Sequence, residues 1–167
     1  MIELAAALAL AGDPSVVPIP IGPPPRYVPA PAARPAAGLT CRSGRSTFRV
    51  HLELFAHRRV VIVPAGIGVA SSGCVYPAHT LEPTGVVEVA HGSRLRLGDL
   101  FRIWGGRLGR HTLLSFRSVA PVRVYVGGKR FPGPPAAVPL TPGAQIVVEL
   151  GDYVPPHPTY LFPRRTP

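Results

Sequence analysis

The sequence has few acidic residues and a single lysine. Only eight Asp and Glu side chains stand against eighteen Lys and Arg in 167 residues, which gives a formal net charge of +10. So few carboxylates disfavour catalysis by a pair of acidic residues. The sequence also contains no Gly-x-Ser-x-Gly elbow, Walker loop or dinucleotide fingerprint. Asp99 is interpreted as a helix cap and Glu149 as a solvated strand residue. The sequence therefore favours a protein that is not an enzyme.

A long apolar run is also missing. The first candidate, from Leu4 to Ala11, is far shorter than the roughly 20 residues that a spanning helix needs, so no transmembrane span is predicted. Glu3 is the only charge before this run, whereas a secretory signal begins with positive charge. Residues 1–12 are interpreted as an apolar segment that is the remnant of a signal peptide. A short apolar extension is the alternative.

Cysteine is scarce as well. Cys41 and Cys74 are the only two, and they form no Cys-x-x-Cys pair, so a zinc ribbon or a thioredoxin-type motif is excluded. One disulfide between them is predicted, and two unpaired buried thiols are the alternative. A bridge closing a loop of this length contributes about 3–4 kcal/mol in the chain-entropy model. Disulfides persist in oxidising compartments, which favours an extracytoplasmic protein, secreted or in the cell envelope, over a cytoplasmic one.

Proline is abundant, and its placement divides the chain. Twenty-three prolines are present, and residues 13–40 are dominated by Pro and Ala, which predicts a disordered, extended linker. Its PPPRYVPAP portion, residues 23–31, could instead be a ligand for an aromatic-lined groove. Residues 152–167 form a Pro-rich C-terminal tail. Four of its side chains are candidates to pack back onto the domain: Tyr153, Tyr160, Leu161 and Phe162.

Residues 41–151 are predicted to form one β-rich globular domain. Phe48, Val50, Leu52 and Leu54 alternate with polar residues, which indicates a half-buried strand. Leu97–Trp104 has helical apolar spacing, with Asp99 expected as its N-terminal cap and Gly105 as its stop. Further strands are expected at residues 60–63, 85–90, 93–97, 122–126 and 145–150. The predicted fold is α+β, mostly β: a small mixed sheet packed on one short helix in a β-grasp-like arrangement, with a β-sandwich as the alternative.

Short motifs follow one another along this domain. They are His51-Leu52, Pro64-Ala65-Gly66-Ile67-Gly68, Cys74, His79-Thr80, Thr84-Gly85, Leu97-Gly98-Asp99-Leu100-Phe101-Arg102-Ile103-Trp104-Gly105 and Val124-Tyr125-Val126-Gly127-Gly128-Lys129. This series resembles an uncharacterised family of small exported bacterial proteins. The family pattern has a His-x-His-x-His-Leu strand, Pro-Ala-x-Ile-Gly, a Cys followed by His-Thr-His-Asp, and a Leu-Gly-x-Phe-Phe-x-x-Trp-Gly helix. The resemblance implies export.

The histidine motifs of that pattern are degenerate in this chain. Thr47 and Arg49 occupy two of the three strand positions, and Leu81 replaces the second histidine of His-Thr-His. An imidazole array on a strand would suit copper, zinc or iron. The remaining candidate ligands are His51, His79 and Glu82, so a transition-metal site is one alternative. Histidines that face solvent or form hydrogen bonds, with no cofactor, are the favoured interpretation.

The positive charge defines the remaining hypotheses. A basic patch is predicted from the arginines around the first hairpin: Arg42, Arg45, Arg49, Arg58 and Arg59. An acidic polymer or a cell-envelope component is the expected partner class. Nucleic-acid binding is a further alternative, disfavoured because no aromatic residues are interleaved with the arginines. The leading hypothesis is a noncatalytic extracytoplasmic domain with a structural or interaction role, ahead of a metal-binding module.

Overall fold

The computed structural model describes residues 38–44, 46–155 and 159–162. Several predictions fall outside these residues. They are the apolar segment 1–12, the linker up to residue 37, Arg45 of the basic patch, and residues 156–158 and 163–167 of the tail.

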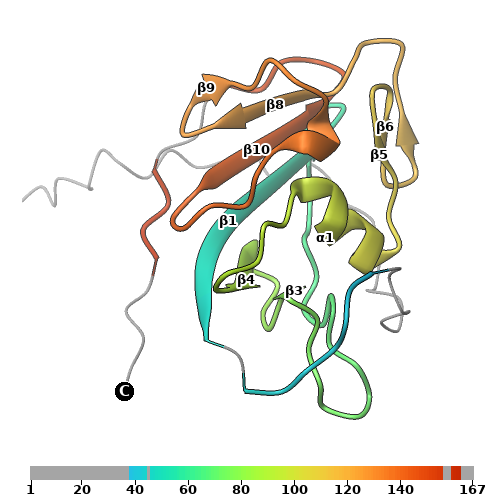
Figure 1. Ribbon diagram of the computed structural model, residues 1–167. Coiled ribbons are helices and arrows are strands. Elements are labelled where there is room, and N and C mark those ends of the chain that lie inside the picture. Colours follow the sequence, from blue (N-terminus) through green and yellow to red (C-terminus); the bar gives the residue numbers. More distant parts are fainter. Residues whose placement is uncertain (1–37, 45, 156–158, 163–167) are drawn as a thin grey trace, which may run out of the picture.

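A mixed seven-stranded sheet forms the centre of the domain (Figure 1). Its strands run in the spatial order β3-β4-β1-β10-β8-β9, and β2 pairs with β1 beside β4. Their bounds are β1 Thr47–Ala56, β2 Arg59–Val61, β3 Ala78–His79, β4 Val86–Ala90, β8 Arg123–Val126, β9 Lys129–Arg130 and β10 Gln145–Leu150.

The pairing around β1 sets the architecture. β1 and β10, the first and last strands, lie side by side in parallel, and every other pairing in this sheet is antiparallel. Hairpins flank this central pair on both sides, which is the β-grasp-like arrangement expected from the sequence. The α+β, mostly β prediction is confirmed. The sheet packs on one helix, so the β-sandwich alternative does not describe the structure.

The helix α1, Leu97–Trp104, covers one face of the sheet, which we call the inner face (Figure 1). The backbone N–H of Arg96 donates to Asp99 Oδ2 at 2.7 Å, and Gly105 ends the helix with φ +78°. Asp99 therefore caps the N-terminus of the helix, as predicted, and it does so from the third helical position, because its side chain accepts from the backbone N–H of the N-cap residue Arg96.

The core lies between α1 and the inner face. Alternate residues of β1 point into it, because side chains of a strand project to opposite faces in turn. The buried side chains contributed by β1, β10 and α1 include Val50, Leu52, Leu54, Ile146, Val148, Leu150, Leu97, Leu100, Phe101, Ile103 and Trp104. The alternating pattern of the first strand is thereby confirmed.

One predicted strand is absent from the described residues, and three elements of the structure were not predicted. Residues 93–97 were expected to form a strand, but only Arg96 forms an isolated bridge, with Pro139. The two-residue strand β3 was not expected. Neither was a separate three-stranded sheet of β5 Leu108–Gly109, β6 Thr112–Leu113 and β7 Phe116–Arg117, nor the short 3-10 helix η1 Pro135–Ala137. Strands of two residues are too short to show a period of two in the sequence.

No helix within the described part of the chain combines the length and the apolar character needed to cross a membrane.

Candidate functional site

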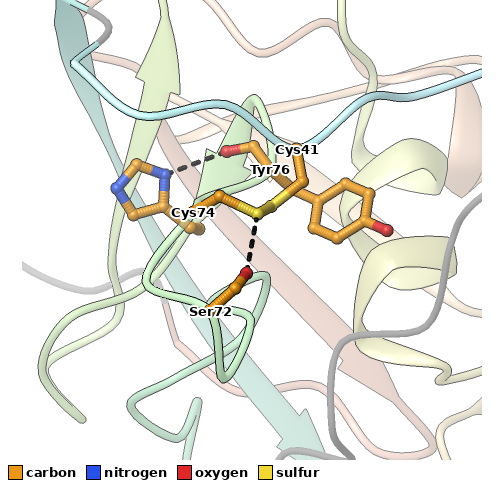
Figure 2. Close-up of a disulfide and its surroundings, with 5 residues drawn as sticks. Cys41, Ser72, Cys74 and Tyr76 are labelled. Atoms are coloured by element: carbon orange, nitrogen blue, oxygen red, sulfur yellow. Dashed lines mark hydrogen bonds between the residues drawn. A yellow bond between two sulfur atoms is a disulfide. The ribbon is translucent and has the colours of Figure 1, made fainter.

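A disulfide joins Cys41 to Cys74, as predicted (Figure 2). The two Cα atoms are 5.5 Å apart. Next to the bond, Arg42 and Val75 exchange two backbone hydrogen bonds, of 2.9 and 3.1 Å, and Ser72 Oγ lies 3.3 Å from Cys74 Sγ. The bridge therefore fixes the segment that enters β1 to the loop that leads into β3.

The face of the sheet opposite α1, which we call the outer face, is rich in polar side chains. Paired residues of neighbouring strands project to the same side, so the register places them together. This face holds Thr47, Arg49, His51, Glu53, His79, Glu88, Arg123, Tyr125, Gln145, Val147 and Glu149. It therefore collects three of the eight acidic residues of the chain.

Ion pairs across strands neutralise two of these carboxylates. Arg49 Nε lies 2.9 Å from Glu88 Oε1, and the Thr47 hydroxyl donates to Glu88 Oε2 at 2.5 Å. Arg123 Nε lies 3.3 Å from Glu149 Oε2. Glu149 is only 1% exposed, so the prediction that it is a solvated strand residue was wrong. It is buried against its arginine on the neighbouring strand.

The C-terminal tail covers part of the outer face. The ring of Tyr160 stacks on His51 with centroids 3.6 Å apart and planes 8° from parallel. The Gln145 amide donates to the Tyr160 carbonyl and accepts from the Tyr160 N–H, each at 3.1 Å. Tyr153 meets Tyr125 edge-on at 6.4 Å. The expectation that the tail packs back is confirmed for both tyrosines, while Leu161 is 85% exposed.

A cavity of about 70 Å³ remains between this tail and the sheet. Its polar and aromatic lining includes His51, Glu53, Tyr125, Gln145, Glu149 and Tyr153. His51 Nδ1 lies 3.6 Å from Glu53 Oε1 at its edge. The sequence pattern marked His51 as a candidate, but it gave no sign that the tail lies on it.

The three candidate metal ligands do not meet. His51 and His79 project from the same outer face, with β4 between their strands. His79 Nδ1 donates to the Tyr76 carbonyl at 3.1 Å, and Glu82 is exposed on the loop before β4. Across residues 38–44, 46–155 and 159–162, no group of three His, Cys, Asp or Glu side chains is arranged to hold a metal ion.

The predicted basic patch is spread along the molecule. Arg42 lies beside the disulfide, ahead of β1, and Arg49 is engaged with Glu88 on the outer face. Arg58 and Arg59 are exposed at the turn that follows the far end of β1. A ten-residue strand is about 30 Å long, so the described arginines form no single contiguous surface.

His79 provides a prediction for the pH dependence of stability. Burial lowers the pKa of His79 from its ordinary value of 6.5, although the Tyr76 carbonyl and the Glu88 charge oppose this. The unfolded chain therefore takes up a proton at a higher pH than the folded chain does. We expect the unfolding free energy to fall as the pH drops below 6.5, by at most about 1.4 kcal/mol per pH unit for this one proton.

Urea unfolding of the wild type and of His79→Gln between pH 5 and 8 measures this effect. The dependence should be flatter in His79→Gln than in the wild type. Equal slopes in the wild type and His79→Gln would show that His79 does not carry the linkage.

Comparison of the chain with protein-family models, with curated proteins and with solved structures gives no match.

Proposed function

We propose that this chain is a noncatalytic domain that works outside the cytoplasm, in a structural or interaction role. The observation that carries this proposal is the disulfide between Cys41 and Cys74. It links the segment that precedes β1 covalently to the loop that precedes β3. Disulfides of this kind are rare where glutathione and thioredoxin keep thiols reduced. The resemblance of the motifs to small exported bacterial proteins points in the same direction.

The outer face supports a noncatalytic role. Catalytic carboxylates and histidines work best when they can meet a substrate and exchange protons with it. Here Glu88 and Glu149 are held by arginines of neighbouring strands, and the Tyr160 ring covers the imidazole of His51. Glu88 and Glu149 therefore link neighbouring strands, and His51 links the sheet to the tail.

Charge favours an acidic polymer or a component of the cell envelope as partner. The chain carries a net charge of +10, and several of its basic side chains are exposed on turns and edge strands. Lys129 and Arg130 extend from the edge strand β9, and Arg58 and Arg59 from the turn after β1. Separated basic side chains suit an extended polyanion, which can contact them in succession.

The only lysine of the chain offers a direct test of the compartment. Lys129 is exposed on β9, and a membrane-impermeant amine reagent applied to intact cells should modify it. The peptide that contains Lys129, identified by mass spectrometry, should be labelled equally in intact and lysed cells, or the chain should be recovered from the medium. Lys129→Arg is the matched control, because it keeps the charge and removes the reactive amine. Labelling of Lys129 only after lysis would contradict the proposal.

A further inference from the structure

We infer that the outer face carries a docking groove for an extended, proline-flanked tyrosine segment, and that its partner is residues 23–31 of a second copy of this chain. We call this site the tail groove and define it by His51, Tyr125 and Gln145, which the C-terminal tail covers in the structure. The inference goes beyond the proposed role by naming a partner, and it does not depend on the compartment.

Gln145 recognises the backbone of an extended chain. Its side-chain amide donates to the carbonyl and accepts from the N–H of one residue, Tyr160. This reciprocal pair satisfies both main-chain groups in the way that a neighbouring strand would. Such recognition does not depend on the side chain at that position, so any extended segment that crosses the groove can use it.

Two rings of the groove recognise aromatic side chains. His51 offers a flat surface on which Tyr160 stacks, and the rings of Tyr125 and Tyr153 meet in a T-shaped contact. Aromatic rings supply large contact areas with few rotatable bonds, which makes them effective anchors for a docking segment. The groove therefore selects tyrosine side chains on an extended backbone.

The tail fills this groove incompletely. Tyr153 remains 54% exposed, and a cavity of about 70 Å³ lies between the tail and the sheet. A segment that fitted the groove closely would fill this space, and a ring that stays half exposed gains only part of the contact area that burial would give it. The Tyr153 end of the tail is thus held weakly enough for another segment to take its place.

The same tripeptide occurs twice in the sequence. Tyr153-Val154-Pro155 lies at the groove, and Tyr27-Val28-Pro29 lies within PPPRYVPAP, residues 23–31. Proline restricts the backbone of such a peptide, so less conformational entropy is lost when it docks. The N-terminal segment therefore carries a second copy of the tripeptide whose tyrosine contacts Tyr125 in the groove.

The segment that docks should come from another molecule. Leu39 and Cys41 pack against the core, which lies between α1 and the inner face, whereas the tail groove opens on the outer face. The sheet therefore separates the point where the N-terminal segment is anchored from the groove. A second copy can present the same segment directly to the outer face.

Titration of the full chain with the peptide PPPRYVPAP tests the groove. We expect the wild type to bind the peptide, and Tyr153→Ala to bind it about two- to tenfold more tightly, because an aromatic edge contact of the competing tail is lost. Adding Tyr125→Ala to the Tyr153→Ala variant should weaken binding by a similar factor, because the ring that receives the peptide tyrosine is gone and Tyr153 no longer competes for it. These opposite responses separate docking from a general loss of structure.

Two controls accompany the titration. A peptide with alanine in place of its tyrosine should not bind, and Val119→Ala, which truncates a side chain that is 98% exposed, should bind like the wild type. Absence of binding to both the wild type and Tyr153→Ala would overturn the groove. Equal affinity of Tyr153→Ala with and without Tyr125→Ala would do the same.

Sedimentation equilibrium then tests the source of the segment. At concentrations above the measured dissociation constant the wild type should self-associate, and Tyr27→Ala should remain monomeric. Ile19→Ala, an apolar truncation in the same Pro-rich segment outside the tripeptide, should associate like the wild type. A monomeric wild type that binds the peptide would overturn the second copy as the source.

Discussion

Trp104→Ala is expected to lower the free energy of unfolding by about 3–5 kcal/mol, the range typical of large aromatic truncations in a core. Trp104 ends α1, is 1% exposed, and lies 5.5 Å from the Phe101 ring between the helix and the sheet. Its removal leaves a cavity that the stiff sheet cannot close. Small domains are stable by only about 5–15 kcal/mol, so this loss should bring the variant near its unfolding transition.

Urea unfolding followed by circular dichroism measures this loss. Ile103→Val, which removes one methylene from the same helix, should cost about 0.5–1.5 kcal/mol and gives a measurable value even where Trp104→Ala unfolds. Val119→Ala should cost nothing measurable, because its side chain is exposed. If Trp104→Ala and Val119→Ala unfolded at the same urea concentration, the packing of Trp104 between α1 and the sheet would not stabilise the domain.

Removal of the disulfide is the second large effect that we expect. Cys41 and Cys74 are 33 residues apart in sequence, so the bridge closes a sizeable loop in the unfolded chain. The double variant Cys41→Ser, Cys74→Ser should lose about 3–4 kcal/mol of unfolding free energy, because its unfolded state regains the entropy of that loop. Guanidinium unfolding of the oxidised wild type and of the double variant measures the difference.

Reduction of the wild type provides the internal control for this loss. Wild-type protein unfolded in the presence of a reductant should match the double variant, and Ser72→Ala, which alters only the hydroxyl beside Cys74, should keep the stability of the oxidised form. A double variant as stable as the oxidised wild type would mean that the disulfide does not contribute to the unfolding free energy of the domain.

The features that rest on strong local patterns could be predicted from the sequence. The alternation around Leu52 gave β1, the spacing of Leu97, Leu100 and Trp104 gave α1, and the glycines after Val126 gave the turn into β9. The order of these elements then favoured a β-grasp-like sheet, which the structure shows. Each of these signals depends only on residues that are close in the chain.

The polar outer face could not be predicted in the same way. Glu149 alternates with apolar residues, as a solvated strand residue does, and only the pairing of β10 with β8 brings Arg123 beside it. His51 also occupies an alternating polar position, and its burial comes from Tyr160, more than a hundred residues later in the sequence. Period-two patterning assigns a residue to a face, but it does not show what covers that face.

Trapping the thiols of the native protein tests the central claim most directly. Cells that produce the chain are quenched with acid, the protein is alkylated under denaturing conditions, and its mass is compared with and without prior reduction. We predict that Cys41 and Cys74 take up the alkylating reagent only after reduction, as a disulfide outside the cytoplasm requires. Alkylation of both cysteines without reductant would contradict the account.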